Sequence, residues 1–185
     1  MLLGYGAKNC WCFKDWLDIN LRLNGYVPKD VSDNRDYSLI LGFEGANASG
    51  KTSALKVFAF IADFIKNSFI YTPESLILYD SFFNNNEPSE FYVEFTDSDE
   101  LEYRYEAILQ KDHVIKETLF LIKSTVEEIL LQRDNNEVSV NHLYDNESKI
   151  ILRNNASIIS TLHQYAIQEI DPVFNFFNKH TINVT

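Results

Sequence analysis

Eight consecutive residues of this chain have the types and spacing that phosphate chemistry requires. Residues 45–52 read GANASGKT, which is the pattern G-x-x-x-x-G-K-[ST] of a phosphate-binding loop, or P-loop. Gly45 and Gly50 permit backbone angles that a side chain would forbid, so the main-chain N–H groups can turn toward a ligand. Lys51 supplies a positive charge that stabilises the β- and γ-phosphates, and the Thr52 hydroxyl suits one coordination position on Mg²⁺.

The sequence on either side of the loop predicts the strand–loop–helix context that this motif needs. Residues 38–43 (SLILGF) are strongly apolar and predict a buried strand. From Lys51 to about Lys66, apolar residues recur at helical spacing, which predicts a helix whose positive dipole end lies beneath the phosphates. The residues expected to contact the nucleotide are Gly45, Ala46, Asn47, Ala48, Ser49, Gly50, Lys51, Thr52 and Ser53.

Composition excludes several other classes of protein. Hydrophobic residues make up 45% of the 185 residues, enough for one globular domain with a core. The net charge of −11 argues against a broad basic surface for nucleic acid, although it leaves room for a basic partner. No segment is long and apolar enough to span a membrane, so we expect a cytoplasmic protein. Cys10 and Cys12 are interpreted as reduced thiols, because a zinc site would need about four ligands.

The order of elements predicts an α/β fold with an antiparallel β meander and C-terminal helices. Strands are expected at residues 2–13 and 16–23, and a loop at 24–36. Alternating apolar residues then predict antiparallel strands at 90–96, 101–109, 114–123 and 127–133. Turns are expected at 97–99, 111–112, 134–136 and 145–146, and helices at 157–167 and from Asp171 onward.

Residues 76–80 (LILYD) have two interpretations. Four apolar residues followed by Asp80 resemble a Walker B strand, where an NTPase places a carboxylate that holds Mg²⁺. The alternative is an ordinary strand or turn that ends in a capping aspartate. We favour the ordinary segment, because so short a motif often matches by chance.

The distribution of glycine limits which kind of NTPase this chain resembles. All six glycines lie at or before position 50. Ser81, Phe82 and Phe83 follow Asp80, so the D-x-x-G of a Ras-type GTPase is absent. The glycine-containing signature motif of an ABC-type ATPase cannot occur after Gly50. The sequence therefore holds a nucleotide cradle without the recognisable remainder of a hydrolytic site.

Several stretches, in order, resemble the N-terminal part of the ABC/SMC-like AAA ATPases of the OLD (overcoming lysogenization defect) group and related phage-defence ATPases of bacteria. Residues 8–21 (KNCWCFKDWLDINL) are similar to the group's opening KNFxSFKDxxxLxL, and residues 45–61 to its GxNASGKSNLLKAL. Residues 87–95 (EPSEFYVEF), followed by YRYEAIL, resemble its P-S-x-F-x-V-x-F and Y-x-Y-x-F strands. Residues 153–160 (RNNASIIS) resemble a short R-x-N-x-S stretch.

This resemblance implies the N-terminal lobe of an ABC/SMC-type head that binds ATP and Mg²⁺. Residues 1–185 would form a partial head, with strands, P-loop and first helix in 1–70, antiparallel strands in 71–155, and the helical start of an arm or insertion in 156–185. Residues 9–13 would lie near the base and ribose, with Trp11 and Cys12 as the candidate contacts and strand-end packing as the alternative. Complete members continue with an arm, a signature motif, Walker B and a switch histidine.

Three functions follow as hypotheses. In the first, the chain is an ATP-binding half-head that pairs with a second head or with the rest of a split head and gates an effector such as a nuclease. Nucleic acid would then be bound only through the larger assembly. In the second, it is a self-contained NTPase or kinase with Asp80 as metal ligand and Glu74 or Glu90 as base. In the third, it is an interaction domain that binds nucleotide without hydrolysing it.

Overall fold

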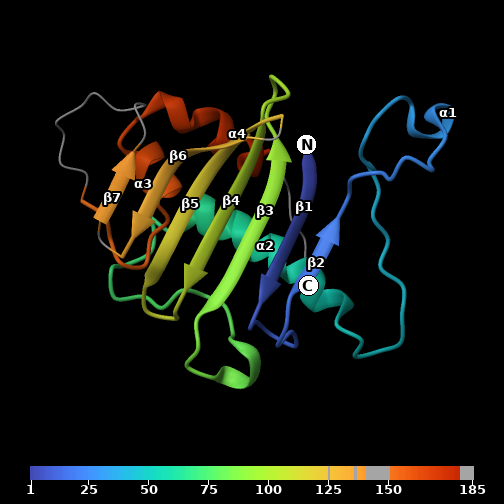
Figure 1. The fold of residues 1–185 in the computed structure, drawn as a ribbon. Coiled ribbons are helices and arrows are strands. Elements are labelled where there is room, and N and C mark those ends of the chain that lie inside the picture. The colour runs from blue at the N-terminus through green and yellow to red at the C-terminus, as the bar shows by residue number, and fades with distance from the viewer. Residues whose placement is uncertain (125, 136, 141–150, 180–185) are drawn as a thin grey trace.

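One antiparallel sheet, covered by helices on a single face, forms the body of the molecule (Figure 1). The computed structural model describes residues 1–124, 126–135, 137–140 and 151–179. The strands in this part of the chain are β1 Leu2–Lys8, β2 Leu17–Asn20, β3 Ser89–Thr96, β4 Glu102–Leu109, β5 Val114–Lys123, β6 Val126–Asp134 and β7 Glu137–Val140. The helices are α1 Lys29–Ser32, α2 Lys51–Asn67, α3 Ile158–Gln164 and α4 Asp171–Asn178, with short 3₁₀ helices η1 Phe82–Asn84 and η2 Gln168–Ile170.

The described strands follow the order β2-β1-β3-β4-β5-β6-β7, and every neighbouring pair is antiparallel. From β3 onward the sheet is a meander, which confirms the strands expected at 90–96, 101–109, 114–123 and 127–133. Strand β7 was not predicted, because four residues give too little alternation to recognise. The turn expected at 145–146 lies outside the described residues.

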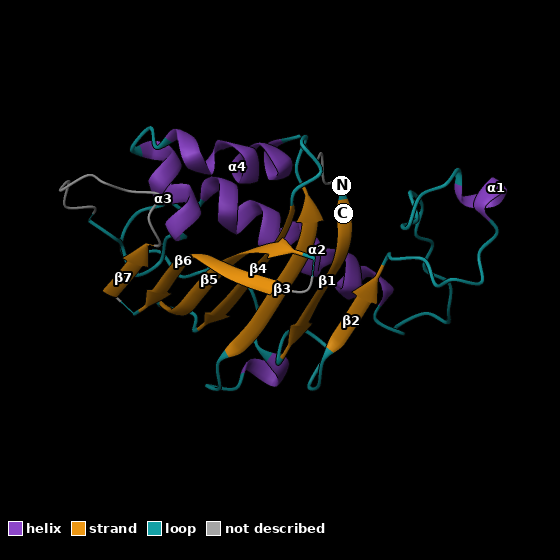
Figure 2. Cartoon of the chain, turned by 45° about the horizontal axis from the view of Figure 1, so that its top comes forward, coloured by secondary structure: helices purple, strands orange, loops and turns teal. Residues whose placement is uncertain are grey.

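The two faces of the sheet differ sharply in polarity. Phe91, Val93 and Phe95 of β3 are buried, whereas Tyr92 and Glu94 between them are partly exposed. Helices α2, α3 and α4 all lie on the buried face, and the other face carries no helix among the described residues (Figure 2). This arrangement is the one that period-two alternation predicts for a sheet with one buried face.

Helix α2 contributes the centre of the core. Its buried residues lie at three- and four-residue spacing, which confirms the helix expected from Lys51. The Phe60 ring lies 4.8 Å from the Phe91 ring of β3 and 5.3 Å from the Tyr79 ring, measured between centroids. Beside α2, the Phe176 ring of α4 stacks on Phe95 at 4.2 Å.

A buried ion pair fastens the start of α3 to the sheet. Glu117 of β5 and Arg133 of β6 are cross-strand partners with fully buried side chains, 3.4 Å apart. The Glu117 carboxylate also accepts hydrogen bonds from the hydroxyls of Tyr105 (2.6 Å) and Ser157 (2.8 Å) and from the backbone N–H of Ile158 (3.0 Å).

The Arg133 guanidinium completes this network through backbone carbonyls. It donates to Ala156 at 2.6 Å, Arg153 at 3.0 Å and Asn135 at 2.6 Å. Because both charged groups are surrounded by hydrogen-bond partners, the pair is tolerated in the core and holds residues 153–158 in one place.

The strand expected at residues 38–43 does not form. Tyr37 makes an isolated bridge with Arg22, and the Ser38 N–H donates to the Leu21 carbonyl at 2.7 Å. Beyond Ser38 the chain leaves the sheet and reaches the P-loop without a β partner, although all of these residues are described. A strand requires a neighbour for its backbone groups, and this apolar segment has none in the described structure.

The first two strands are shorter than expected. Strand β1 ends at Lys8, where Asn9 and Trp11 adopt positive φ angles of 56° and 46° and turn the chain toward β2. Residues 76–80 cross the molecule outside the named strands, with Ile77 and Tyr79 buried. No helix in the described part of the chain is both long and apolar enough to cross a membrane.

The substitution Glu117→Gln is expected to lower the free energy of unfolding by about 3 kcal/mol or more, because it leaves Arg133 buried without its counter-charge. Tyr105→Phe removes a single hydrogen bond from the same carboxylate and should cost about 1 kcal/mol. Urea denaturation followed by circular dichroism measures both effects.

The matched control is Glu128→Gln, which removes a partly exposed carboxylate paired with Lys123 at 2.7 Å on the neighbouring strand. It should cost less than about 1 kcal/mol. Equal costs for Glu117→Gln and Glu128→Gln would show that the buried network does not stabilise the fold.

Candidate phosphate-binding site

The P-loop ends at the first residue of α2, so the backbone N–H groups at the helix start face the loop. Gly50 is the N-cap residue, with φ of 90°, and makes no side-chain cap. The first turn of α2, all of which is described, carries no acidic side chain. The orphan N–H groups and the positive end of the helix dipole are therefore available to an anion.

The loop backbone is held in a conformation suited to anion binding. Gly45, Ala48 and Gly50 have positive φ angles of 155°, 63° and 90°. The Ser49 N–H donates to the Ala46 carbonyl at 3.3 Å and closes a turn within the loop. Successive residues that alternate between right- and left-handed conformations bring their N–H groups together, which is the geometry of a phosphate nest. Alanine in the left-handed region is strained, and such strain is found at ligand sites.

Lys51 curls back over this loop. Its Nζ donates to the carbonyls of Gly45 and Ala46, both at 2.7 Å, and approaches the Ser49 Oγ at 3.4 Å. The ammonium group therefore already lies within the loop that would hold the phosphates, where it can exchange carbonyl partners for phosphate oxygens. Thr52 is exposed next to it, so its hydroxyl is accessible to a hydrated Mg²⁺.

The turn after β1 lies against the end of the P-loop. A Cβ atom built on Gly50 would lie 3.1 Å from the Cys12 Sγ and 3.4 Å from the Phe13 ring. The Cys12 thiol is exposed at this point, whereas burial raises the pKa of Cys10 to about 12 and keeps that thiol neutral. The resemblance implies that residues 9–13 lie near the base and ribose, and the structure brings Cys12 and Phe13 of this stretch to Gly50.

Trp11 faces a different environment from Cys12. Its indole packs edge-on against Phe60 of α2, with ring centroids 6.2 Å apart, and is partly buried against the core. Its backbone N–H donates to the Asp80 carbonyl at 2.7 Å. The geometry thus brings Cys12 to the P-loop and gives Trp11 contacts with the core.

The acidic residues considered for metal binding or catalysis are each exposed or engaged in an ion pair. The Asp80 carboxylate is exposed and pairs with Lys111 at 3.0 Å. Glu90 pairs with Lys8 at 2.9 Å on the face of the sheet opposite α2, and Glu74 is exposed on the 71–75 turn. Within the described residues, no group of three His, Cys, Asp or Glu side chains could hold a metal. Thr52 is thus left as the predicted metal ligand within the loop itself.

Gly50→Ala should weaken nucleotide binding at least about tenfold and lower the free energy of unfolding by about 1–2 kcal/mol, because alanine is strained at a φ of 90° and its Cβ would crowd Cys12. Gly42→Ala is the matched control, since a Cβ there meets nothing within 4 Å. Calorimetric titration and urea denaturation measure the two effects. Loss of binding in both variants would mean that the weaker nucleotide binding does not result from strain at Gly50.

Comparison with known proteins identifies the kind of domain. The chain matches a family model described as "AAA domain, putative AbiEii toxin, Type IV TA system" over residues 40–170, well over half of the 185 residues. The match begins just before the P-loop and includes the sheet from β3 onward as well as α3. Neither the curated proteins nor the solved structures gave a match. The chain belongs to this family of AAA domains, which supports its assignment as a nucleotide-binding domain of the ATPase type.

Proposed function

We propose that this chain binds Mg-ATP through residues 45–53 as the N-terminal part of an ABC/OLD-type ATPase head. The observation that carries the proposal is an unbroken P-loop, with three positive φ angles, at the uncapped start of a 17-residue helix. Membership in an AAA family supports the same assignment. The P-loop reads phosphates, and the choice of ATP over GTP follows from the resemblance to the OLD group.

Each residue of the loop has a defined role in this proposal. The backbone N–H groups of residues 46–52 surround the phosphates, and Lys51 neutralises charge on the β- and γ-phosphates. The Thr52 hydroxyl would hold Mg²⁺, which would supply positive charge that stabilises the phosphates. Cys12 and Phe13 border the loop and limit where the nucleoside can lie.

The chain supplies the cradle without the groups that complete hydrolysis. The Asp80 carboxylate is engaged by Lys111, and no glycine follows position 50 to form a signature motif. Catalysis of phosphoryl transfer depends on charges placed around the γ-phosphate from all sides. We therefore assign hydrolysis to an assembly in which a second head, or the rest of this head, covers the nucleotide.

An uncovered apolar segment next to the P-loop supports this assignment. Leu39, Ile40 and Leu41 are 53%, 84% and 43% exposed, in the part of the chain that stands away from the sheet in Figure 1. Three consecutive aliphatic residues, without alternation, are typical of a parallel strand that is buried on both faces. Leu55 on the outer side of α2 is also about half exposed. We propose that strands from the rest of the head pair with residues 38–43 and cover α2.

The wider role follows from the resemblance and the family description. ATP binding would gate an effector such as a nuclease in bacterial defence against phage, and the family description names a toxin of a type IV toxin–antitoxin system. With a net charge of −11, nucleic acid would be bound through other parts of the assembly. This role requires the protein to act in the cytoplasm.

The first test is calorimetric titration of the chain with Mg-ATP, followed on the same sample by a phosphate-release assay. We expect binding without steady release, because the cradle is present and the rest of the site is not. Lys51→Ala should weaken binding at least about tenfold, since it removes the charge that contacts the phosphates. Lys56→Ala, an exposed lysine farther along the same helix, is the matched control and should bind like the unmodified chain.

Other results would contradict the proposal. Steady phosphate release that Asp80→Ala abolishes would establish the self-contained NTPase. Equal binding by the Lys51→Ala and Lys56→Ala variants would rule out the P-loop as the site. If Mg-ATP binding stabilises the chain but adding a second head or an effector produces no hydrolysis, the chain is an interaction domain that binds nucleotide without hydrolysing it.

We expect the isolated chain to self-associate through the uncovered residues 38–43, and Ile40→Asp should reduce this association because it places a charge in that apolar segment. Sedimentation velocity measures the effect over a concentration series. Val126→Asp is the control, since Val126 is 65% exposed at the start of β6, outside this segment. If both variants associate like the unmodified chain, residues 38–43 do not form an interaction surface.

A further inference from the structure

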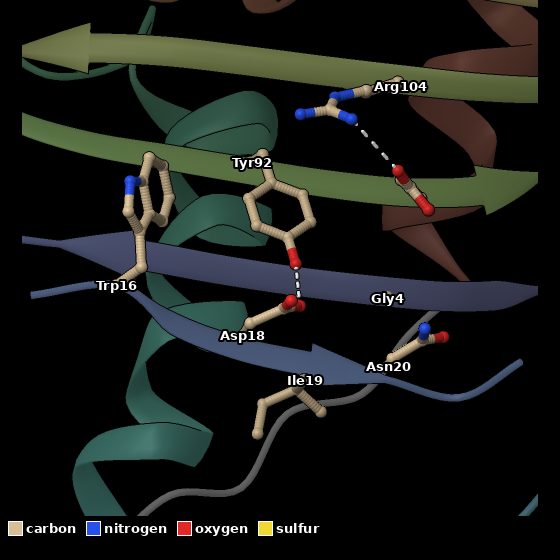
Figure 3. A pocket seen from close by; sticks show the side chains of 8 residues that line it. Gly4, Trp16, Asp18, Ile19, Asn20, Tyr92 and Arg104 are labelled. Carbon is tan, nitrogen blue, oxygen red and sulfur yellow. Dashed lines mark hydrogen bonds and ion pairs between the residues drawn. The ribbon is translucent and has the colours of Figure 1, made fainter.

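A pocket of about 320 Å³ lies on the face of the sheet that carries no helix among the described residues (Figure 3). It spans β2, β1, β3 and β4, so its position is set by the sheet and not by a loop. The residues that line it are Gly4, Trp16, Asp18, Ile19, Asn20, Tyr92, Glu94 and Arg104. Its volume is near the lower end of the roughly 300–1,000 Å³ typical of ligand sites, which suits a single side chain.

Glycine makes the hollow possible. A Cβ atom on Gly6 would lie 2.3 Å from the Tyr92 Cε1 and 2.4 Å from the Leu17 carbonyl oxygen. Gly4, two residues earlier on the same face of β1, would meet the Ile19 carbonyl oxygen at 3.1 Å. Side chains are thus absent along the middle of the pocket, and the Tyr92 ring lies across the bare strand.

Two aromatic rings form one side of the pocket. The indole of Trp16 is 49% exposed and lies 5.8 Å from the Tyr92 ring, at an interplanar angle of 53°. The Tyr92 hydroxyl donates to the Asp18 carboxylate, as Figure 3 shows. Burial and the Asp18 carboxylate raise the pKa of Tyr92, so that its hydroxyl remains a donor and fixes the position of Asp18.

The cations near the pocket are already engaged. The Arg104 guanidinium lies 5.2 Å from the centre of the Tyr92 ring and donates to Glu106 at 2.7 Å and Glu94 at 3.3 Å. Arg22 pairs with Glu94 at 3.3 Å. The positive charges of Arg22 and Arg104 are therefore largely neutralised. Each carboxylate has about four lone-pair sites, so the carboxylates of the pocket can still accept further hydrogen bonds.

The outer face of the sheet around the pocket carries a net negative charge. Outward-facing carboxylates outnumber the cations on the same side of β1 to β4. The carboxylates are Asp18, Glu90, Glu94, Glu102 and Glu106, and the cations are Lys8, Arg22 and Arg104. An anion such as a phosphate would be repelled here. A cation would be attracted by the Asp18 carboxylate and by the exposed face of the Trp16 indole.

We infer that this pocket binds an arginine or lysine side chain from a basic segment of a partner protein. The half-exposed indole supplies a face for the cation, Asp18 supplies the counter-charge, and the net charge of −11 favours encounter with a basic partner. This site is independent of the P-loop, because it lies on the opposite face of the sheet from α2.

The test is a titration of the full chain with the basic pentapeptide GKRKG and its neutral counterpart GQQQG, both blocked at their termini, at low salt. The readout is the indole N–H signal of Trp16 in a two-dimensional NMR spectrum. We expect GKRKG to shift this signal in a saturable way and GQQQG to leave it unchanged. Equal shifts with both peptides, or none with GKRKG, would overturn the inference.

Two variants separate the pocket from general electrostatic attraction. Asp18→Asn should weaken GKRKG binding about three- to tenfold, because it removes the counter-charge and keeps the side-chain shape. Asp15→Asn, an exposed carboxylate just before Trp16 that does not line the pocket, should have little effect. Equal weakening by the two substitutions would show that the peptide follows net charge alone. Circular dichroism confirms that each variant is folded.

Discussion

The packing of α2 against the inner face of the sheet is the constraint on which the rest of the structure depends. Val57, Phe60, Ile61, Phe64 and Ile65 are buried on this helix, and each such side chain contributes about 1.5–3 kcal/mol relative to exposure. The same packing fixes the direction of the helix, and so determines where its N-terminus and the P-loop lie. A loop with a strained backbone can be held in a phosphate-binding conformation because the helix behind it cannot shift.

The other elements arrange themselves around this helix. The turn after β1 reaches the P-loop because β1 lies beside β3, against which α2 packs. The Glu117–Arg133 network fastens residues 153–158 to β5 and β6, and thereby brings α3 and α4 alongside α2. One face of the sheet is thus covered and specified by apolar contacts. The opposite face is free to carry the polar pocket around Tyr92.

The sequence predicts the parts of this structure that depend on local patterns. Phe91, Val93 and Phe95 alternate with polar residues and mark a half-buried strand, and Lys51 follows a motif that opens a helix. Contacts between distant segments are harder to predict. Glu117 is a charged residue on a strand, so the sequence pattern predicts that it faces solvent. It is buried because Arg133 and residues 153–158 surround it in the folded structure. Phe13 meets Gly50 only because β1 and α2 share the same core.

Residues 38–43 show the limit of such prediction most clearly. Their composition indicates a buried strand, yet a strand also needs partners, and the described chain provides none. The discrepancy is informative about function, because it occurs directly before the P-loop. It is consistent with a nucleotide cradle whose surroundings are completed by another part of the protein or by a second chain.

The most direct test of the central claim is to map Mg-ATP binding on the backbone amides of the isotopically labelled chain by NMR. We expect the largest shifts at Ala46 to Thr52, smaller shifts at Cys12 and Phe13, and little change on the outer face of the sheet at Tyr92 and Arg104. If the amide signals of residues 46–52 do not move when Mg-ATP is added, the nucleotide binds elsewhere or not at all. Either result would contradict the proposal that this loop is the nucleotide cradle.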